Sequence, residues 1–197
     1  DEGKGQHGAA HMLEHMVFRP WGPAPAQDLA NEIEGAGGEV NASTSHDETV
    51  FHATLPARGA EFALRALGRA VLGRRFEASD YEREREVVVE EIHQYEDDAA
   101  EVVGDQMLVQ LFGDDGYGRP ILGTEATVRG MDVKALTRFY RRAYVGSRLR
   151  VVVVGMLQAW HRFARRRVWA SSTTRTTEGE AACVAAPNPI RTPTLMR

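Results

Sequence analysis

His11-Met12-Leu13-Glu14-His15 is the stretch of this 197-residue chain that decides its fold. The surrounding residues, 8–18, are good helix formers without a proline, so we predict a helix there. The two histidines are four positions apart, so both imidazoles leave one face of the helix, and Glu14 shares that side. Catalytic zinc needs a histidine pair of this kind and a third ligand from elsewhere in the chain. A further carboxylate beside the metal takes a proton from the bound water.

The order of these residues inverts the commoner His-Glu-x-x-His pattern, and both orders place two histidines and one glutamate on one helix face. Five residues alone are only moderately specific, since the same pattern arises by chance on solvated helices. Glu91 is the candidate third ligand: 75 residues lie between it and His15, and it belongs to a second predicted helix. Glu84 faces the same way two turns earlier and is placed to orient a ligand. Without the histidine motif, the glutamates of this helix would indicate only a solvated face.

The composition is that of an ordinary soluble globular protein, with 43% hydrophobic and 26% charged residues, and the length predicts one domain or most of one. A net charge of −4 gives no reason to expect a nucleic-acid partner. The longest apolar run, Val151–Val154, is far too short to span a membrane. Cys183 is the single cysteine, so metal ligands must be histidines and carboxylates rather than a thiolate cluster.

Hydrophobic periodicity predicts an α+β fold, in which an antiparallel or mixed sheet is packed by several helices. Ser79-Asp80-Tyr81-Glu82 is typical of a capping box at the start of the helix that carries Glu91. We expect Leu149–Val154 to form a buried strand because its residues are apolar. The other predicted elements are helices over 26–34, 57–72, up to 111 and 132–144, and paired strands over 39–44 and 49–55.

Four blocks of sequence, in the right order, resemble the pitrilysin, insulinase and mitochondrial-processing-peptidase family of inverzincin metallopeptidases. These blocks are 8–18, 37–42, 84–92 and 118–125, and the resemblance covers roughly residues 3–155. It implies the metallohydrolase fold of the processing-peptidase type. It also implies a zinc-dependent endopeptidase that cleaves peptides or presequences. The resemblance to bacterial members implies a soluble protein of the cytoplasm or periplasm, without deciding between them.

The family resemblance implies a role for each residue of the motif. His11, His15 and Glu91 would hold Zn²⁺. Glu14 would be the general base that activates the zinc-bound water and then the proton donor to the leaving amine. Glu84 would support the site from behind the ligands.

The resemblance also implies two kinds of partner. Asn41 and Ala42 match the edge strand along which the family binds a peptide substrate in extended conformation, by strand addition. The family builds its active chamber from two homologous halves, so a second half or a partner subunit is expected.

The chain departs from the family pattern at both ends. Only ten residues precede His11, where the family has two strands, and the sequence after Gly155 looks unrelated. We therefore predict an N-terminal catalytic domain over 1–155 that lacks its first strands and is incomplete at both ends. Residues 156–197 are predicted to be a divergent or disordered tail.

Two alternatives remain open. The first is a non-catalytic or fragmentary partner subunit of a two-chain peptidase, although such subunits usually lose the zinc residues that are present here. The second is the S-ribosylhomocysteine lyase family, which shares the His-x-x-Glu-His helix and uses a cysteine as third ligand. Cys183, far along the chain, is the single candidate for that role.

Overall fold

Helix α1 (Ala9–Phe18) carries the His-x-x-Glu-His motif and lies at the centre of the first of two compact units. The protein is represented by a computed structural model that describes residues 2–3, 5–19, 29–114, 116–155, 173–176 and 181–185. The first unit spans Asp1–Ala143 and the second Tyr144–Arg197. After α1, the first unit contains α2 (Leu29–Gly35), β1 (Glu39–Thr44), β2 (Thr49–Thr54), η1 (Ala57–Gly59), α3 (Ala60–Leu72), α4 (Ala78–Glu96), α5 (Ala99–Phe112), η2 (Gly116–Gly118), α6 (Glu125–Gly130) and α7 (Val133–Ala143).

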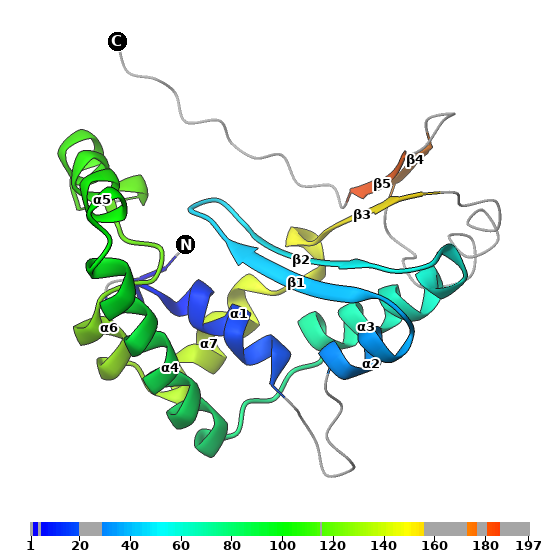
Figure 1. The fold of residues 1–197 in the computed structure, drawn as a ribbon, viewed down its shortest axis with the longest axis horizontal. Coiled ribbons are helices and arrows are strands. Elements are labelled where there is room, and N and C mark those ends of the chain that lie inside the picture. The colour runs from blue at the N-terminus through cyan, green and yellow to red at the C-terminus, as the bar shows by residue number, and fades with distance from the viewer. Residues whose placement is uncertain are drawn as a thin grey trace. The chain divides into compact units, whose positions relative to one another are not determined.

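The apolar residues of α1 form the middle of the core. Met12, Leu13, Met16 and Val17 are at most 2% exposed, and burying each such side chain is worth about 1.5–3 kcal/mol. In Figure 1, α1 runs between α4 and the β1–β2 hairpin, and it contacts both, as well as α3 and α7. The helix that carries the motif is therefore held on several sides.

Strands β1 and β2 form an antiparallel hairpin, as predicted. The register pairs Glu39 with Thr54 and Thr44 with Thr49. Along β2, half-buried and exposed residues alternate, so Phe51 and Ala53 share the inner face and His52 is exposed. The predicted helix over 57–72 is present as η1 followed by α3.

Helix α4 begins earlier than the sequence suggested. Its N-cap residue is Glu77, whose side chain makes no capping hydrogen bond, and Ala78 is the first helical residue. The predicted capping box at Ser79 is therefore wrong: Ser79 already lies inside the first turn, where its backbone belongs to the helix. Asp98 is the N-cap of α5, and its side chain accepts a hydrogen bond from the Ala100 amide, which separates α5 from α4.

The described residues of the second unit form η3 (Gly146–Arg148) and three antiparallel strands in the order β3-β5-β4. These are β3 (Arg150–Val154), β4 (Thr173–Thr176) and β5 (Ala181–Ala185). The expectation of a buried strand is wrong for β3, because Val152 and Val154 are 63% and 70% exposed. Alternate residues of a strand face opposite sides, and only one side of β3 is half-buried.

The α+β class with antiparallel strands and several helices is confirmed. The division between 1–155 and 156–197 stays a prediction, since most of the predicted tail lies outside the described residues. Residues 26–28, the first of the predicted helix over 26–34, also lie outside the described residues.

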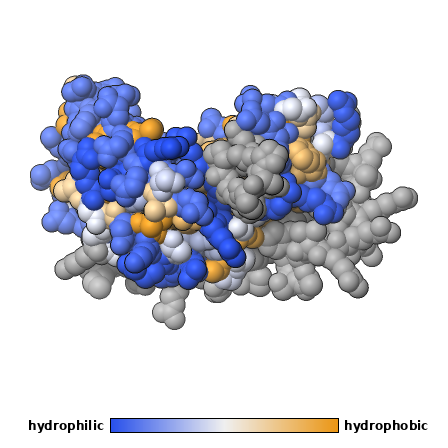
Figure 2. All heavy atoms as spheres, turned by 90° about the horizontal axis from the view of Figure 1, so that it is seen from below, coloured by the Kyte–Doolittle hydropathy of each residue, from blue (hydrophilic) through white to orange (hydrophobic). Residues whose placement is uncertain are grey.

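The described surface is mostly hydrophilic in the view of Figure 2, with hydrophobic residues in small separate groups. Helix α5 exposes the most apolar side chains: Val103, Met107 and Leu111, one turn apart, are each more than half exposed. Among the described residues, no helix is both long and apolar enough to cross a membrane.

Candidate metal centre

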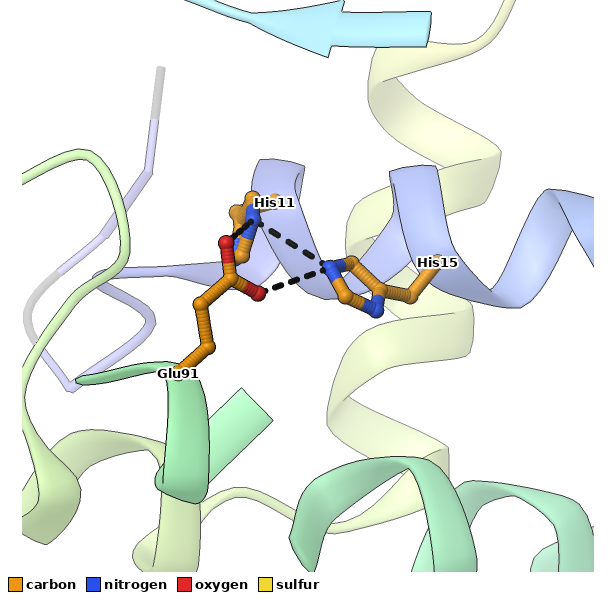
Figure 3. A group of neighbouring side chains, drawn as sticks. All are labelled: His11, His15 and Glu91. Carbon is orange, nitrogen blue, oxygen red and sulfur yellow. Dashed lines mark hydrogen bonds and ion pairs between the residues drawn. The ribbon is translucent and has the colours of Figure 1, made fainter. Parts of the chain in front are cut away.

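The structure brings His11, His15 and Glu91 together from two helices. Figure 3 shows the Glu91 side chain reaching from α4 towards the two imidazoles of α1. The Nε2 atoms of the histidines lie 3.3 Å apart. Glu91 Oε1 lies 3.6 Å from Nε2 of His11, and Oε2 lies 3.2 Å from Nε2 of His15. In the part of the chain that the structure describes, this is the one group of three such residues whose ligand atoms could hold a metal ion.

The spacing of these atoms suits zinc. Four ligand atoms placed tetrahedrally at about 2.0–2.1 Å from a zinc ion lie about 3.3 Å from one another. The three distances of 3.2, 3.3 and 3.6 Å match that value closely. Two histidines and one carboxylate also form a known catalytic zinc set, which leaves the fourth position for water. The residues present therefore fit the ion that the sequence predicts.

A carboxylate behind His15 orients its ring. Nδ1 of His15 lies 3.0 Å from Oε1 of Glu84, and the other Glu84 oxygen accepts a hydrogen bond from Nε of Arg19. An ionised carboxylate only accepts hydrogen bonds, so Nδ1 of His15 is the donor. Nε2 of the neutral ring therefore keeps its lone pair, directed towards His11 and Glu91.

The two histidines differ in their protonation. Burial and the nearby charge of His15 lower the pKa of His11 to about 4, so His11 is neutral at pH 7. Burial also disfavours the charged form of His15, but the hydrogen bond to Glu84 and the charges of Glu91, Glu84 and Glu14 outweigh it and raise the pKa of His15. Burial would raise the pKa of Glu84, yet His15 and Arg19 lower it, so Glu84 is ionised.

The N-terminus of α1 is held by backbone contacts and by Glu2. The Glu2 carboxylate accepts hydrogen bonds from the amides of Gly8 and Ala10, at 3.1 and 2.8 Å. Gly8 has φ +87°, and a Cβ there would lie 2.4 Å from the Leu122 carbonyl oxygen. Gly123 has φ +77°, and a Cβ there would lie 2.4 Å from the His7 carbonyl oxygen. The glycines therefore let two loops touch backbone to backbone at the start of the motif helix.

The C-terminus of α1 is held by Arg74. Its buried guanidinium donates hydrogen bonds to the carbonyls of Met16 and Arg19, in the last turn and at the C-cap of α1. The Arg74 amide lies 3.1 Å from the Tyr140 hydroxyl, which in turn donates to the Val71 carbonyl. Burial lowers the pKa of Arg74 to about 10, so it is still charged at pH 7.

Glu14 lies on α1 between the two histidines, and its carboxylate does not belong to the three-residue group. Its Oε2 accepts a hydrogen bond from the hydroxyl of Thr44, at the end of β1. The Glu14 charge acts on His15, which places this carboxylate near the group.

Asn41 and Ala42 lie in the middle of β1, opposite His52 and Phe51 of β2. Within the described residues of the first unit, β1 pairs with β2 alone and so has one free edge. The Ala42 amide donates a hydrogen bond to Oδ1 of Asn41, at 2.8 Å, rather than to another strand.

Known proteins are similar to this chain in sequence and in fold. The sequence profile of the family described as Insulinase (Peptidase family M16) matches residues 1–125, well over half of the chain. The chain belongs to the insulinase family of peptidases. Its sequence is 39% identical over 155 residues to an uncharacterized zinc protease of Mycobacterium leprae, covering 79% of this chain and 35% of that protein.

Other insulinase-family proteins are similar over the same region. A probable mitochondrial-processing peptidase subunit beta of Arabidopsis thaliana is 31% identical over 152 residues, which is 77% of this chain and 29% of that protein. Among solved structures, the periplasmic protease PqqL from Escherichia coli superposes with a TM-score of 0.63 at 26% identity, over 73% of this chain and 17% of PqqL. The chain thus spans about a third or less of the length of these relatives, and the predicted family and fold type are confirmed.

Three residues around the site were missed at the sequence level: Thr44, Arg19 and Arg74. Thr44 and Ala42 lie on the same side of β1, so strand alternation could have indicated that Thr44 faces inward. For Arg19 and Arg74, no local pattern distinguishes them from the other arginines of the chain.

Proposed function

We propose that this chain is the zinc-binding part of an endopeptidase of the insulinase family, with His11, His15 and Glu91 as the zinc ligands. The observation that carries the proposal is the convergence of their three ligand atoms within 4.8 Å of one another. The Glu84 carboxylate behind His15 supports it, because histidines that bind metal usually donate their other N–H to such a group. Two mycobacterial relatives that are named as uncharacterized zinc proteases support it as well.

Bound zinc would supply Lewis acidity, which polarises a peptide carbonyl and brings the pKa of a bound water to about 7. Glu14 would be the general base: its carboxylate would hold the proton removed from the attacking water. It would then return this proton to the nitrogen of the leaving amine. Glu14 suits that role because it shares the helix face of the two histidines without joining their three-residue group.

The substrate would be a peptide in extended conformation, added as a strand to the free edge of β1. Backbone pairing along Asn41 and Ala42 would give affinity with little dependence on sequence. The peptide would first have to displace the Asn41 side chain from the Ala42 amide. Peptides or presequences are the substrate class that we propose.

A second homologous half, or a partner subunit, would complete the chamber around this site. The support is the length relation, since the chain covers 35% of the Mycobacterium leprae relative and 17% of PqqL. A non-catalytic subunit is less well supported, because Glu14 and the complete set of candidate ligands are present in one place.

Replacing the proposed base tests the function. Glu14→Gln should keep the zinc of the wild-type chain and lower the hydrolysis of an unstructured fluorogenic peptide by at least about 10²-fold. Glu34→Gln, at an exposed position of α2, should match the wild type in both measurements. Hydrolysis by Glu14→Gln at the wild-type rate would refute the assignment of the base.

A further inference from the structure

Thr44 connects the β hairpin to the carboxylate of Glu14. Its hydroxyl hydrogen-bonds to Oε2 of Glu14, 30 residues earlier in the chain, and its side chain is half-buried. No other hydrogen bond reaches the Glu14 side chain from the described part of the protein. The hydroxyl of Thr49 lies 3.2 Å from that of Thr44.

The chemistry of the three groups fixes the direction of these hydrogen bonds. An ionised carboxylate only accepts, so the Thr44 hydroxyl donates its single hydrogen to Glu14. The Thr44 oxygen is then the acceptor for the hydroxyl of Thr49. Because Thr44 and Thr49 are cross-strand partners, the hairpin register sets this chain of hydrogen bonds, and a slip of one residue would turn Thr44 to the other face.

A hydrogen bond to one carboxylate oxygen limits the rotation of a long side chain. With Oε2 held, Oε1 of Glu14 keeps its lone pairs for a water molecule. A displacement of about 1 Å in such a group can cost about 10²-fold in rate. β1 also carries Asn41 and Ala42, so one strand contacts both the proposed base and the proposed peptide edge.

We propose that Thr44 is a positioning residue for Glu14, which holds this carboxylate in a fixed orientation relative to strand β1. The inference rests on the proposed function, in which Glu14 is the general base. Thr49 supports Thr44 by donating to its oxygen. A peptide added to β1 and the carboxylate that acts on it are then aligned by the same strand.

A double-mutant cycle tests the contact in the metal-free chain, without any need for activity. The urea midpoint is measured for Thr44→Val in the wild-type background and again in Glu14→Ala. We expect the midpoint shift caused by Thr44→Val to differ between the two backgrounds, whereas Thr54→Val, on the exposed side of β2, shifts both equally. Equal shifts for Thr44→Val in both backgrounds would overturn the proposal. Thr44→Ser, which keeps the hydroxyl, should shift the midpoint equally in the two backgrounds.

Kinetics of the zinc-loaded chain test the consequence. Thr44→Val should lower kcat about 10²-fold with KM and zinc content unchanged, and Thr44→Ser should recover most of this loss. Wild-type kcat in Thr44→Val, or no recovery in Thr44→Ser, would overturn the positioning role. If Glu14→Gln lowers hydrolysis while Thr44→Val keeps the wild-type kcat, only this inference fails. If Glu14→Gln leaves hydrolysis intact, the proposed function itself fails.

Discussion

The Nδ1 atom of His15 lies 3.0 Å from Oε1 of Glu84, 69 residues further along the chain. This contact joins α1 to α4 directly behind the candidate metal site. It orients the His15 ring so that Nε2 is directed at His11 and Glu91. The same two helices therefore supply the ligands and the group that orients one of them.

Removing the charge of Glu84 should weaken zinc binding. Glu84→Gln loses the ionised acceptor of His15 Nδ1, and the loss of such a partner typically costs 10–100-fold in metal affinity. Competition with a chromogenic chelator measures the dissociation constant. Glu86→Gln, an exposed residue of α4 that pairs with Arg129, is the control and should bind zinc like the wild type. Unchanged affinity in Glu84→Gln would show that His15 needs no such support.

Zinc affinity should depend on pH through His15. Metal binding requires neutral imidazoles. In the folded chain, burial of the His15 ring is outweighed by the hydrogen bond to Glu84 and the charges of Glu91, Glu84 and Glu14, which raise the pKa of His15 above its usual value. Apparent affinity should therefore fall about tenfold per pH unit as the pH drops below the pKa of His15, and level off above it. His11, with a pKa of about 4, is already neutral and adds a second proton only below that pH.

Calorimetry in buffers of different ionisation enthalpy measures the protons released on binding. We expect about one proton, from His15, in a window of mildly acidic pH well above the His11 pKa of about 4, and a smaller number at higher pH. Release of two protons in that window would mean that His11 is also protonated in the folded chain.

Arg74 should matter for stability because it holds the C-terminal end of α1. Arg74→Met leaves the carbonyls of Met16 and Arg19 without this donor, which should lower the free energy of unfolding by about 2 kcal/mol. Urea unfolding of the metal-free chain measures the change. Arg75→Met, at the neighbouring exposed position, should stay within about 0.5 kcal/mol of the wild type. Equal effects of the two substitutions would contradict the capping role.

A side chain at Gly8 should disturb the start of the motif helix. Gly8→Ala places a Cβ 2.4 Å from the Leu122 oxygen in a left-handed conformation, which by itself costs about 1–2 kcal/mol. Gly104→Ala in α5 is the matched control, because nothing lies within 4 Å of a Cβ there. That variant should gain about 0.5–1 kcal/mol from the better helix former. A neutral Gly8→Ala would mean that the two loops separate at little cost.

Local patterns predicted the elements that carry the site but not all of their contacts. The spacing of His11 and His15 needs only helix geometry, and the hairpin follows from alternation along 39–44 and 49–55. The pairing of Glu91 with the histidines depends on how α1 packs against α4, and the family resemblance supplied this pairing where periodicity could not. Thr44 and Arg74 act across 30 and 58 residues. Strand alternation could have indicated that Thr44 faces inward, but no local pattern indicates its partner Glu14 or the role of Arg74.

Two local predictions failed for physical reasons. A capping sequence at Ser79 competes with a helix that can begin two residues earlier, with Glu77 as its N-cap and without any side-chain cap. An apolar run such as Val151–Val154 suits burial, but neighbouring elements decide which of its faces is covered.

The zinc content of Glu91→Gln tests the central claim most directly. The wild-type chain, loaded with zinc and dialysed against metal-free buffer, should retain about one zinc ion per chain, whereas Glu91→Gln should lose it. Glu90→Gln, the exposed neighbour on α4, and Cys183→Ser should both retain the wild-type amount. Equal zinc content in Glu91→Gln and the wild type, measured by elemental analysis, would contradict the assignment of Glu91 as the third ligand.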